Sequence, residues 1–407
     1  MKEFFKVAHI EDVLGLKNKF PLVGKETIPI YNAFGRVLAE ELTSRHDIPD
    51  FSKSTMDGFA VLASSTFGAS EGNPALLRIA GTVTMGKAPD FSIQPGEAGR
   101  ILTGGMLPSG ADSVVMIEHT EVLDENTIEV YRSVAPLSNV IEQGEEFSKG
   151  DLVMTRGTCL RAQELALLAA MGENEVKVFK CPVVGIISTG DEVVPVNVEI
   201  DPGQVRDMNT YALIGLCQQA GAVPVSFGIV PDRRDALLLV CTKALEECDM
   251  VIVSGGSSVG SRDYTIDVLT ALQNSRIFIH GVAISPGKPT ILARAQGKAV
   301  WGLPGHVVSA MVVFDTLILP FIEHIAGCTT QKKLTIPARL TRNIASVQGR
   351  VDFVRVQLEE KDGELWADPV LGKSGVIRTM VKAGGLIQIG LNEEGIDQGT
   401  VVRVFPF

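Results

Sequence analysis

The sequence predicts a multidomain protein in which a doubly wound, mostly parallel α/β sheet is joined to two β-rich units and a helical linking domain. Three observations lead to this fold class. Residues 183–327 alternate short β-branched runs with helix-length amphipathic segments, which is typical of an open sheet covered by helices on both faces. From residue 328 onward the apolar runs become short and alternating, as in a small β-barrel. Residues 48–141 are broken by Gly and Pro and show no long helical periodicity.

Five apolar, β-branched runs predict the strands of the α/β region. They are Val183–Ser188, Val223–Val230, Met250–Ser254, Arg276–Ile284 and Ala299–Leu303. Amphipathic periodicity between them predicts helices at about 208–220, 232–247, 263–274 and 307–325. Ligands of such sheets bind at the carboxyl ends of the strands, so the loops that follow these runs are the candidate site.

The two β-rich units are predicted from shorter runs. Before residue 142 the strand candidates are Gly58–Leu62, Leu76–Ile79, Arg100–Leu102, Ser113–Ile117 and Thr127–Tyr131. After residue 328 they are Leu334–Leu340, Phe353–Leu358, Glu364–Val370, Leu386–Ile389 and Val401–Phe405. Helical signals at His9–Lys17 and Arg161–Met171 flank the first unit, which suggests an insertion. The predicted domains are a discontinuous helical linking domain (1–47 and 142–178), a β-rich inserted domain (48–141), the α/β domain (179–327) and a C-terminal β-barrel (328–407).

Composition excludes several classes of protein. The 407 residues include 37 Lys and Arg against 48 Asp and Glu, and the net charge of −11 has the wrong sign for a nucleic-acid binder. The first residues lack the apolar core of a secretory signal, so a cytoplasmic protein is expected. The apolar stretch from Val307 to Ile325 contains Asp315 and Glu323, which predicts a buried helix and no membrane contact. Six scattered cysteines are predicted to be reduced core thiols.

Two loops at the predicted strand ends carry groups suited to anions and cations. Residues 188–192 read S-T-G-D-E, in which the glycine lets backbone N–H groups approach an anion and the carboxylates could hold Mg²⁺ or place a water. Taken alone, this segment is more typical of a common turn. Residues 254–260 read S-G-G-S-S-V-G and lead into a helix, which indicates an oxyanion cradle.

Two further loops are expected at the same edge of the sheet. In Ser285-Pro286-Gly287-Lys288-Pro289 the prolines restrict the loop that presents Lys288. The segment G-L-P-G-H over residues 302–306 turns a strand into the long helix and adds helix-terminal N–H groups. Asp207, Asn209 and Asp232 precede helices and are predicted to be N-caps. Together these loops suggest a phosphorylated ligand and a divalent cation.

Seven motifs in fixed order resemble the MoeA family, the molybdopterin molybdenumtransferases that include the gephyrin E domain. They are S-T-M-D-G-F-A (54–60), R-I-L-T-G (100–104), G-A-D-S-V-V (110–115), S-T-G-D-E (188–192), S-G-G with V-G and D-Y-T (254–265), P-G-K-P (286–289) and G-L-P-G (302–305). The resemblance spans essentially the whole chain. It implies a cytoplasmic homodimer whose α/β domain, similar to MogA, binds molybdopterin or adenylylated molybdopterin.

The resemblance also implies a reaction and partners. The reaction is Mg²⁺-dependent cleavage of the adenylyl group, with release of AMP, coupled to insertion of molybdate into the pterin dithiolene. Molybdopterin adenylyltransferase and proteins that deliver the cofactor to molybdoenzymes are the implied partners.

By position, the resemblance assigns roles to individual residues. Asp191, Glu192 and Asp263 would bind the metal, Glu192 and Asp263 would also act in catalysis, and Lys288 would hold the anion. Asp57 and Thr103 would act in the cleft of the partner subunit. The residues expected to contact the pterin, its phosphate or the oxoanion are Ser188, Thr189, Gly190, Gly255, Gly256, Ser257, Ser258, Gly260, Pro304, Gly305, His306, Ser309, Arg350 and Ser374.

Two departures from the family pattern leave alternatives open. Many members have a lysine in place of Ser285 and a proline in place of Val307. Loss of a cation weakens attraction for a dianion by about 1–3 kcal/mol in a desolvated site. The chain could therefore use tungstate, be a diverged paralogue, or be a non-catalytic scaffold. A serine hydrolase using Ser258 is a further alternative, because residues 256–260 match G-x-S-x-G.

Overall fold

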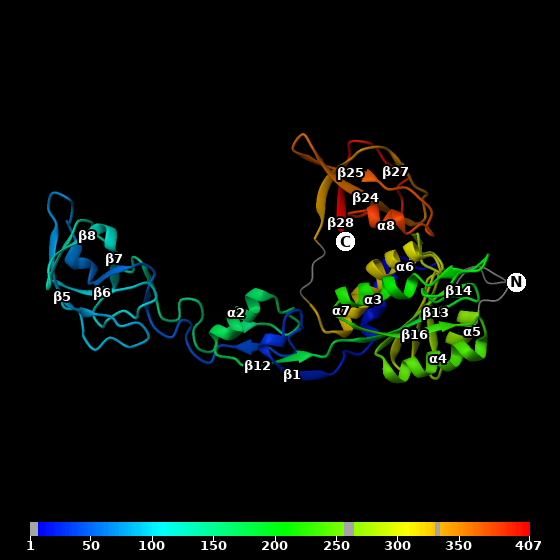
Figure 1. Cartoon of the computed structure of the whole chain (residues 1–407), viewed down its shortest axis with the longest axis horizontal. Coiled ribbons are helices and arrows are strands. Elements are labelled where there is room, and N and C mark those ends of the chain that lie inside the picture. The colour runs from blue at the N-terminus through cyan, green and yellow to red at the C-terminus, as the bar shows by residue number, and fades with distance from the viewer. Residues whose placement is uncertain (1–6, 256–263, 330–333) are drawn as a thin grey trace. The chain divides into compact units, whose positions relative to one another are not determined.

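The computed structural model describes residues 7–255, 264–329 and 334–407 (Figure 1). The chain forms two compact units, and each is described by itself. The larger unit comprises Met1–Ala39, Gly157–Arg161 and Val176–Phe407, and the smaller unit comprises Glu40–Arg156 and Ala162–Glu175.

A six-stranded sheet forms the centre of the larger unit. Its strands, in spatial order, are β16 (Val223–Val230), β13 (Val183–Thr189), β17 (Met250–Ser254), β21 (Lys298–Leu303), β20 (Ile291–Ala295) and β18 (Arg276–His280). The first four run parallel, β20 runs antiparallel to β21, and the edge strand β18 pairs antiparallel with β20 and so points the same way as the first four. The mostly parallel sheet predicted from the sequence is confirmed.

Helices cover both faces of this sheet (Figure 1). They are α3 (Asn209–Gln219), α4 (Arg234–Glu247), α5 (Tyr264–Ala271), α6 (Val307–Val313) and α7 (Leu319–Ile325). On one face α3, α6 and α7 pack on Ile186 and Ile252, and on the other α4 and α5 pack on Ile187 and Val251. Neighbouring residues of one strand therefore enter different cores, which is why these strands read as continuous apolar runs.

The long apolar helix is a core element. Residues Phe314–Ile318 between α6 and α7 form a π-helical turn, and Pro320 follows in the first turn of α7. Proline has no N–H to donate to the preceding turn, which accounts for the local break in the helical ladder. The stretch Val307–Ile325 has the length and hydropathy of a membrane span, but 61% of it is buried inside the protein, as predicted for a buried helix.

One predicted strand is wrong in its extent. The run Arg276–Ile284 was predicted as a single strand, but β18 ends at His280, and Ile284–Ser285 (β19) pairs with the C-terminal barrel. Gly281, at φ +99°, turns the chain between them. Because the run is apolar almost throughout, its periodicity does not reveal where the chain leaves one sheet for another. Strand β20 was missed by the sequence analysis.

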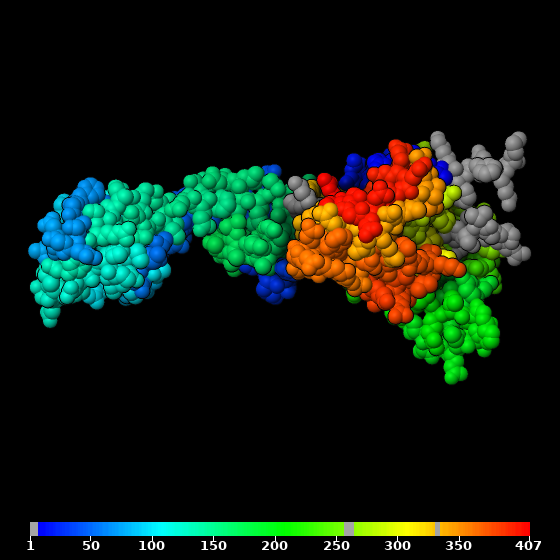
Figure 2. Space-filling view, turned by 90° about the horizontal axis from the view of Figure 1, so that it is seen from above, coloured from blue at the N-terminus to red at the C-terminus, as the bar shows by residue number. Residues whose placement is uncertain are grey.

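A closed five-stranded barrel ends the chain, which confirms the predicted fold of this part. Strands β24 (Val351–Lys361), β25 (Glu364–Pro369), β22 (Ile336–Leu340), β28 (Val401–Pro406) and β26 (Gly385–Ile389) follow one another, and β26 pairs back to β24. Its core contains Leu340, Val356, Ile387 and Val404. Helix α8 (Arg378–Lys382) and the pair β23 (Ile344–Ala345) and β27 (Gly395–Ile396) complete it. The barrel surface is orange to red in Figure 2.

The N-terminal segment packs against the α/β domain. It forms α1 (Ile10–Gly15), the 3₁₀ turn Leu16–Lys19 and β1 (Lys25–Pro29), which pairs with β12 (Glu175–Phe179). Phe20 contacts the rings of Phe278 and Phe321. These contacts fix the start of the chain along the β18 edge of the sheet.

The smaller unit is built on a second six-stranded sheet, in agreement with the predicted β-rich unit. Its strands, in spatial order, are β7 (Ser113–Met116), β4 (Gly58–Val61), β6 (Glu97–Ile101), β5 (Ala75–Thr82), β9 (Thr127–Val130) and β8 (Thr120–Asp124). Short pairs are formed by β2 (Leu42–Thr43) with β11 (Leu152–Met154) and by β3 (Lys53–Ser54) with β10 (Val140–Ile141). Helix α2 (Ala162–Ala170) also belongs to this unit.

Three of the cysteine thiols are buried. Cys217, Cys241 and Cys248 are buried, and burial raises the pKa of Cys217 and Cys241 to about 12 and that of Cys248 to about 11. With a disulfide reagent at pH 8 we expect these thiols to react at least about tenfold more slowly in the native protein than in urea. Mass spectrometry of the labelled peptides would identify the sites. Native labelling of Cys241 at the rate of unfolded protein would contradict the expectation.

Candidate functional site at the carboxyl ends of the parallel strands

The ends of β13 and β17 lie in direct contact. Ser188 and Thr189 are buried at the end of β13. Gly255 follows β17 at φ +111°, and a Cβ atom there would lie 2.1 Å from the carbonyl oxygen of Thr189. A glycine is therefore required at this position, both for its backbone conformation and for the close approach. Gly190, at φ +145°, gives the β13 loop its own turn.

Asn209 joins three of the loops. Its side-chain amide donates hydrogen bonds to the Ser254 hydroxyl (2.6 Å) and to the carbonyl of Gly305 (2.9 Å). The prediction that Asn209 is an N-cap is wrong, because it is the first residue of α3 and its side chain is used between loops. Asp207 lies one residue before the N-cap, Met208, and its carboxylate accepts the N–H (3.1 Å) and hydroxyl (2.6 Å) of Thr210 in the first turn of α3.

The Asp-Glu pair after β13 is oriented by the neighbouring loop. One carboxylate oxygen of Asp191 accepts the N–H of Asp232 at 3.0 Å, and the Thr189 hydroxyl donates to the Asp232 carboxylate at 2.6 Å. Asp232 therefore braces the β13 loop and does not cap α4, which corrects its prediction as an N-cap. The carboxylates of Asp191 and Glu192 are exposed at this edge.

The short strands β14 (Val193–Val194) and β15 (Val205–Arg206) follow this pair. They run parallel, and the Glu192 carbonyl accepts the N–H of Val205 at 2.9 Å. The backbone on both sides of the carboxylates is therefore fixed by hydrogen bonds.

Part of the predicted cradle lies outside the described residues. These positions are Gly256, Ser257, Ser258, Gly260 and Asp263. Within the described ranges no group of three or more His, Cys, Asp or Glu side chains could hold a metal ion. Asp191 and Glu192 are thus the described part of the predicted metal site.

Six of the predicted site residues line one cavity of about 610 Å³. They are Lys288, Pro304, His306, Ser309, Arg350 and Ser374. The α/β domain contributes the first four and the barrel the last two. The pairing of β19 with β24, with Ile284 opposite Val351 and Ser285 opposite Asp352, brings the two domains together at this cavity.

Hydrogen bonds fix the orientation of the polar groups in this cavity. The Arg350 guanidinium forms an ion pair with Asp352 at 2.9 Å, and the Ser346 hydroxyl donates to the same carboxylate at 2.7 Å. His306 Nδ1 and the Ser374 hydroxyl are 2.7 Å apart. One cationic, one imidazole and one hydroxyl side chain are therefore already positioned by partners.

Lys288 stands on a loop pressed against α6. Gly287 has φ +119°, and a Cβ there would lie 2.5 Å from Val313 Cγ2. The Thr290 hydroxyl donates to the Gly287 carbonyl at 2.6 Å. Lys288 itself is exposed, and the half-buried Ser285 lines the cavity beside it.

Other residues of the cavity were missed by the sequence analysis. His9 and Gln348 line it, although neither lies in a glycine-rich motif. His9 reaches the site because Ala8 bridges to Val282, a pairing between segments far apart in the sequence. The spacing of residues within a short stretch of sequence does not predict a contact between segments so far apart.

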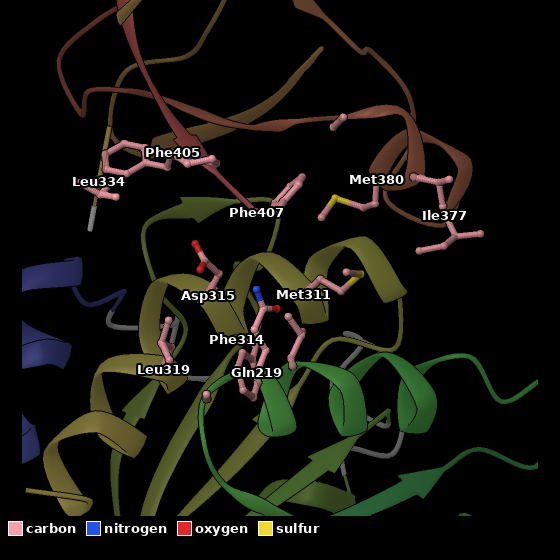
Figure 3. A pocket seen from close by; sticks show the side chains of 15 residues that line it. Gln219, Met311, Phe314, Asp315, Leu319, Leu334, Ile377, Met380, Phe405 and Phe407 are labelled. Atoms are coloured by element: carbon pink, nitrogen blue, oxygen red, sulfur yellow. The ribbon is translucent and has the colours of Figure 1, made fainter. Parts of the chain in front are cut away.

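A second cavity, of about 650 Å³, is apolar (Figure 3). It lies between α3, the α6–α7 helix and the barrel, and Met311, Phe314, Met380 and Phe407 line it. None of the predicted site residues is among the described residues around it. The polar cavity is therefore the candidate site.

Asp57 and Thr103 form a pair within the smaller unit. The Asp57 carboxylate accepts the backbone N–H of Thr103 at 2.7 Å and its hydroxyl at 2.8 Å. These bonds, the backbone N–H foremost, hold the pKa of Asp57 below its usual value although the carboxyl is exposed. Asp57 is thus anionic and fixed in direction at neutral pH.

Replacing Thr103 by valine removes the hydroxyl donor but keeps the stronger backbone bond. We expect the pKa of Asp57 to rise part of the way toward the ordinary carboxyl value, because one stabilising bond to the anion is lost. The stability that this carboxylate contributes would then be lost at a higher pH on acidification. NMR titration of the Asp57 carboxyl carbon measures the shift, with Thr82→Val, an exposed threonine of the same unit, as the control. Identical titration curves in wild type and Thr103→Val would contradict the assignment.

Family models of known proteins match most of the chain. Family models match over three segments: the MoeA N-terminal region (domain I and II) over residues 8–172, a probable molybdopterin binding domain over 185–324, and the MoeA C-terminal region (domain IV) over 337–407.

Full-length relatives and solved structures match as well. A putative molybdopterin biosynthesis protein of Methanocaldococcus jannaschii is 37% identical and covers 93% of this chain and 91% of its own length. The molybdopterin molybdenumtransferase of Bacillus subtilis is 32% identical over 93% of this chain and 89% of its own. A crystal structure of a molybdopterin biosynthesis MoeA protein from Pyrococcus horikoshii matches with a TM-score of 0.80 at 36% identity, over 98% of this chain and 99% of its own. The chain therefore belongs to the MoeA family of molybdenum cofactor biosynthesis proteins.

Proposed function

We propose that this protein is a molybdopterin molybdenumtransferase that inserts molybdate into adenylylated molybdopterin with release of AMP. The observation that carries the proposal is the polar cavity, in which Lys288 and Arg350 face a common space with His306, Ser309 and Ser374. Two cations with hydroxyl donors suit a tetrahedral oxoanion. The relatives named molybdopterin molybdenumtransferase support the same reaction.

The strand-end loops are suited to the pterin phosphate and the adenylyl group. Gly190 and Gly255 keep backbone close to the edge of the sheet where an anion would approach. Asn209 and Asp232 hold these loops together through side-chain and backbone hydrogen bonds, so the donors are positioned before substrate binds. In this assignment the phosphate lies beside Asp191, and the dithiolene end points toward Lys288.

The described residues fit a magnesium ion. Mg²⁺ uses one or two protein carboxylates and completes its coordination with water and substrate phosphates. Asp191 and Glu192 provide two adjacent exposed carboxylates, and only one oxygen of Asp191 is engaged in a bond to a described residue. Bound there, Mg²⁺ would neutralise charge on the phosphates. Asp263 would be the third carboxylate of this site.

The protein acts as a homodimer in this proposal. Asp57 and Thr103 lie in the smaller unit, and we assign them to the active site of the partner subunit. The pre-ordered Asp57 carboxylate would bind or orient a donor group there. Sedimentation velocity of the purified protein tests the oligomeric state.

The function is tested by anaerobic incubation with adenylylated molybdopterin and Mg²⁺, while AMP release and metal bound to the pterin are followed. Titration of molybdate against tungstate tests whether Ser285 changes the preferred oxoanion. We expect molybdate-dependent release of AMP, and Asp191→Asn should reduce it while Asp201→Asn, an exposed change in the following loop, should not. If no AMP were released with molybdate or with tungstate, the transferase proposal would be contradicted and a scaffold would be favoured.

A further inference from the structure

A basic pocket lies on the β18 side of the sheet, at the end where the parallel strands begin. The candidate active site lies at the other end, where these strands finish. The basic pocket has a volume of about 580 Å³, and the residues that define it are Lys19, Asn274, Arg276, Phe278, Arg294 and Gln296. Arg276 opens β18 and Arg294 lies near the end of β20, whereas the candidate site lies beyond the ends of β13, β17 and β21. No residue is shared between this pocket and the polar cavity.

Two arginines of the pocket are direct cross-strand neighbours. Arg276 of β18 pairs with Arg294 of β20 in the antiparallel register. Like charges directly opposite each other destabilise a sheet, because their side chains leave the strands close together on one face. Arg294 is exposed between the buried Ala293 and Ala295, so it cannot turn into the core. The fold therefore keeps an unfavourable pair at this position.

The ring of Phe278 holds two of the cations in place. Lys19 Nζ lies 5.0 Å from the ring centroid and Arg276 Cζ lies 5.5 Å from it. Phe20 packs edge-on against the same ring, with centroids 6.3 Å apart. Cation–π contacts of this kind orient the charges without neutralising them.

The three cations have no acidic partner among the residues that the structure describes. Elsewhere in the described chain Arg36 pairs with Glu26 and Arg339 with Glu364, but no ion pair or hydrogen bond joins Lys19, Arg276 or Arg294 to a carboxylate. The protein as a whole carries a net charge of −11. A local excess of three positive charges is therefore a specific feature of this edge.

Two side-chain amides add neutral donors to the same pocket. Asn274 and Gln296 both stand at turn positions with positive φ, 54° and 52°. Gln296 belongs to the tight turn between β20 and β21, and Asn274 to the turn that leads into β18. Amide N–H groups and arginine forks are the usual donors to phosphate oxygens.

We propose that the basic pocket binds a phosphate-class polyanion, for which pyrophosphate, with two linked phosphoryl groups, is a small probe. The arginine pair would take one phosphoryl group in bidentate fashion, and Lys19 would contact the second. A bound anion would neutralise the repulsion between Arg276 and Arg294. This repulsion destabilises the free protein, so its removal would strengthen binding. The volume exceeds that of one phosphate and is within the range of small-ligand sites.

Isothermal titration of the full-length protein with pyrophosphate, without Mg²⁺ and at low salt, tests the proposal. We expect a binding event that weakens at least about tenfold in Arg294→Gln and falls with added salt. It should persist in Lys288→Gln, which alters only the candidate active site, and in Arg403→Gln, a matched exposed arginine of the barrel. Replacement of pyrophosphate by AMP, which has a single phosphate, is expected to give weaker binding.

Thermal melting supplies a second readout, the rise in melting temperature when pyrophosphate is added. Replacing an exposed arginine outside the pocket should not change this rise. Pyrophosphate should raise the melting temperature of the wild type and of Lys288→Gln more than that of Arg294→Gln, in which only the candidate active site is left to bind it. Loss of pyrophosphate binding in Lys288→Gln, with Arg294→Gln unchanged, would overturn the proposal. Sedimentation velocity supplies a further test. If Arg276→Gln formed a smaller oligomer than the wild type, the proposal would be overturned, because the three cations would then contact a second copy of the chain and not a ligand.

Discussion

Replacing Lys288 by glutamine is expected to raise the molybdate concentration for half-maximal AMP release by about 100-fold, which corresponds to about 2.7 kcal/mol. Among the described residues, Lys288 and Arg350 are the two permanent cations that line the polar cavity. Since Ser285 contributes no charge, a dianion there depends on these two side chains more than in a site that has another lysine.

The control for this change is Lys382→Gln, an exposed lysine of α8 that does not line the cavity. The readouts are AMP release as a function of molybdate concentration and metal recovered on the pterin. If AMP release by Lys288→Gln depended on molybdate concentration as in the wild type, the oxoanion would not bind in this cavity.

Replacing Gly255 by valine is expected to destabilise the larger unit by about 2–4 kcal/mol and to abolish AMP release. The new Cβ would lie 2.1 Å from the Thr189 carbonyl oxygen, and φ at +111° is unfavourable for a β-branched residue. Either the β13 or the β17 loop has to move, which separates the groups that Asn209 joins.

Gly215→Ala is the matched control for the glycine change. Gly215 lies inside α3, and a Cβ there would meet no atom within 4 Å. Alanine should therefore stabilise the helix by about 0.5–1 kcal/mol and leave activity unchanged. Thermal melts and AMP release measure both variants. If Gly255→Val melted at the wild-type temperature, the close contact of the two loops would be refuted.

Much of the architecture was predictable because the periodicity is strong. The runs Val223–Val230 and Met250–Ser254 coincide with β16 and β17. Strand β17 is buried throughout and is therefore a continuous apolar run, whereas the edge strand β16 is recognisable by its β-branched residues although it is largely exposed or half-buried. Apolar continuity concealed the end of β18, where apolar residues continue across Gly281 into β19. The sequence shows that the segment is buried but not which of two sheets it joins.

The site was predictable where glycine or charge marked a loop, and not where a contact bridges distant segments. Lys288, His306 and Arg350 share one cavity; the first two were predicted from their own glycine-bearing loops, and Arg350 from the family resemblance. Asn209 and Asp232 were assigned to caps because a polar residue before a helix usually has that role. Their actual partners, Ser254 and Asp191, are 45 and 41 residues away in sequence, and local patterns do not report such distances.

The pairing of β19 with β24 has a consequence for motion of the barrel. Ser285 is hydrogen-bonded in the barrel's sheet only three residues before Lys288, and Arg350 directly precedes Val351, which pairs with Ile284. The loop that carries Lys288 is therefore held at two points: Ser285 pairs with the barrel, and Gly287 packs on Val313 of α6. A shift of the barrel against the α/β domain would have to separate β19 from β24 or pull this loop away from α6. The loop thus acts as a short tether that limits how far Arg350 can move from Lys288.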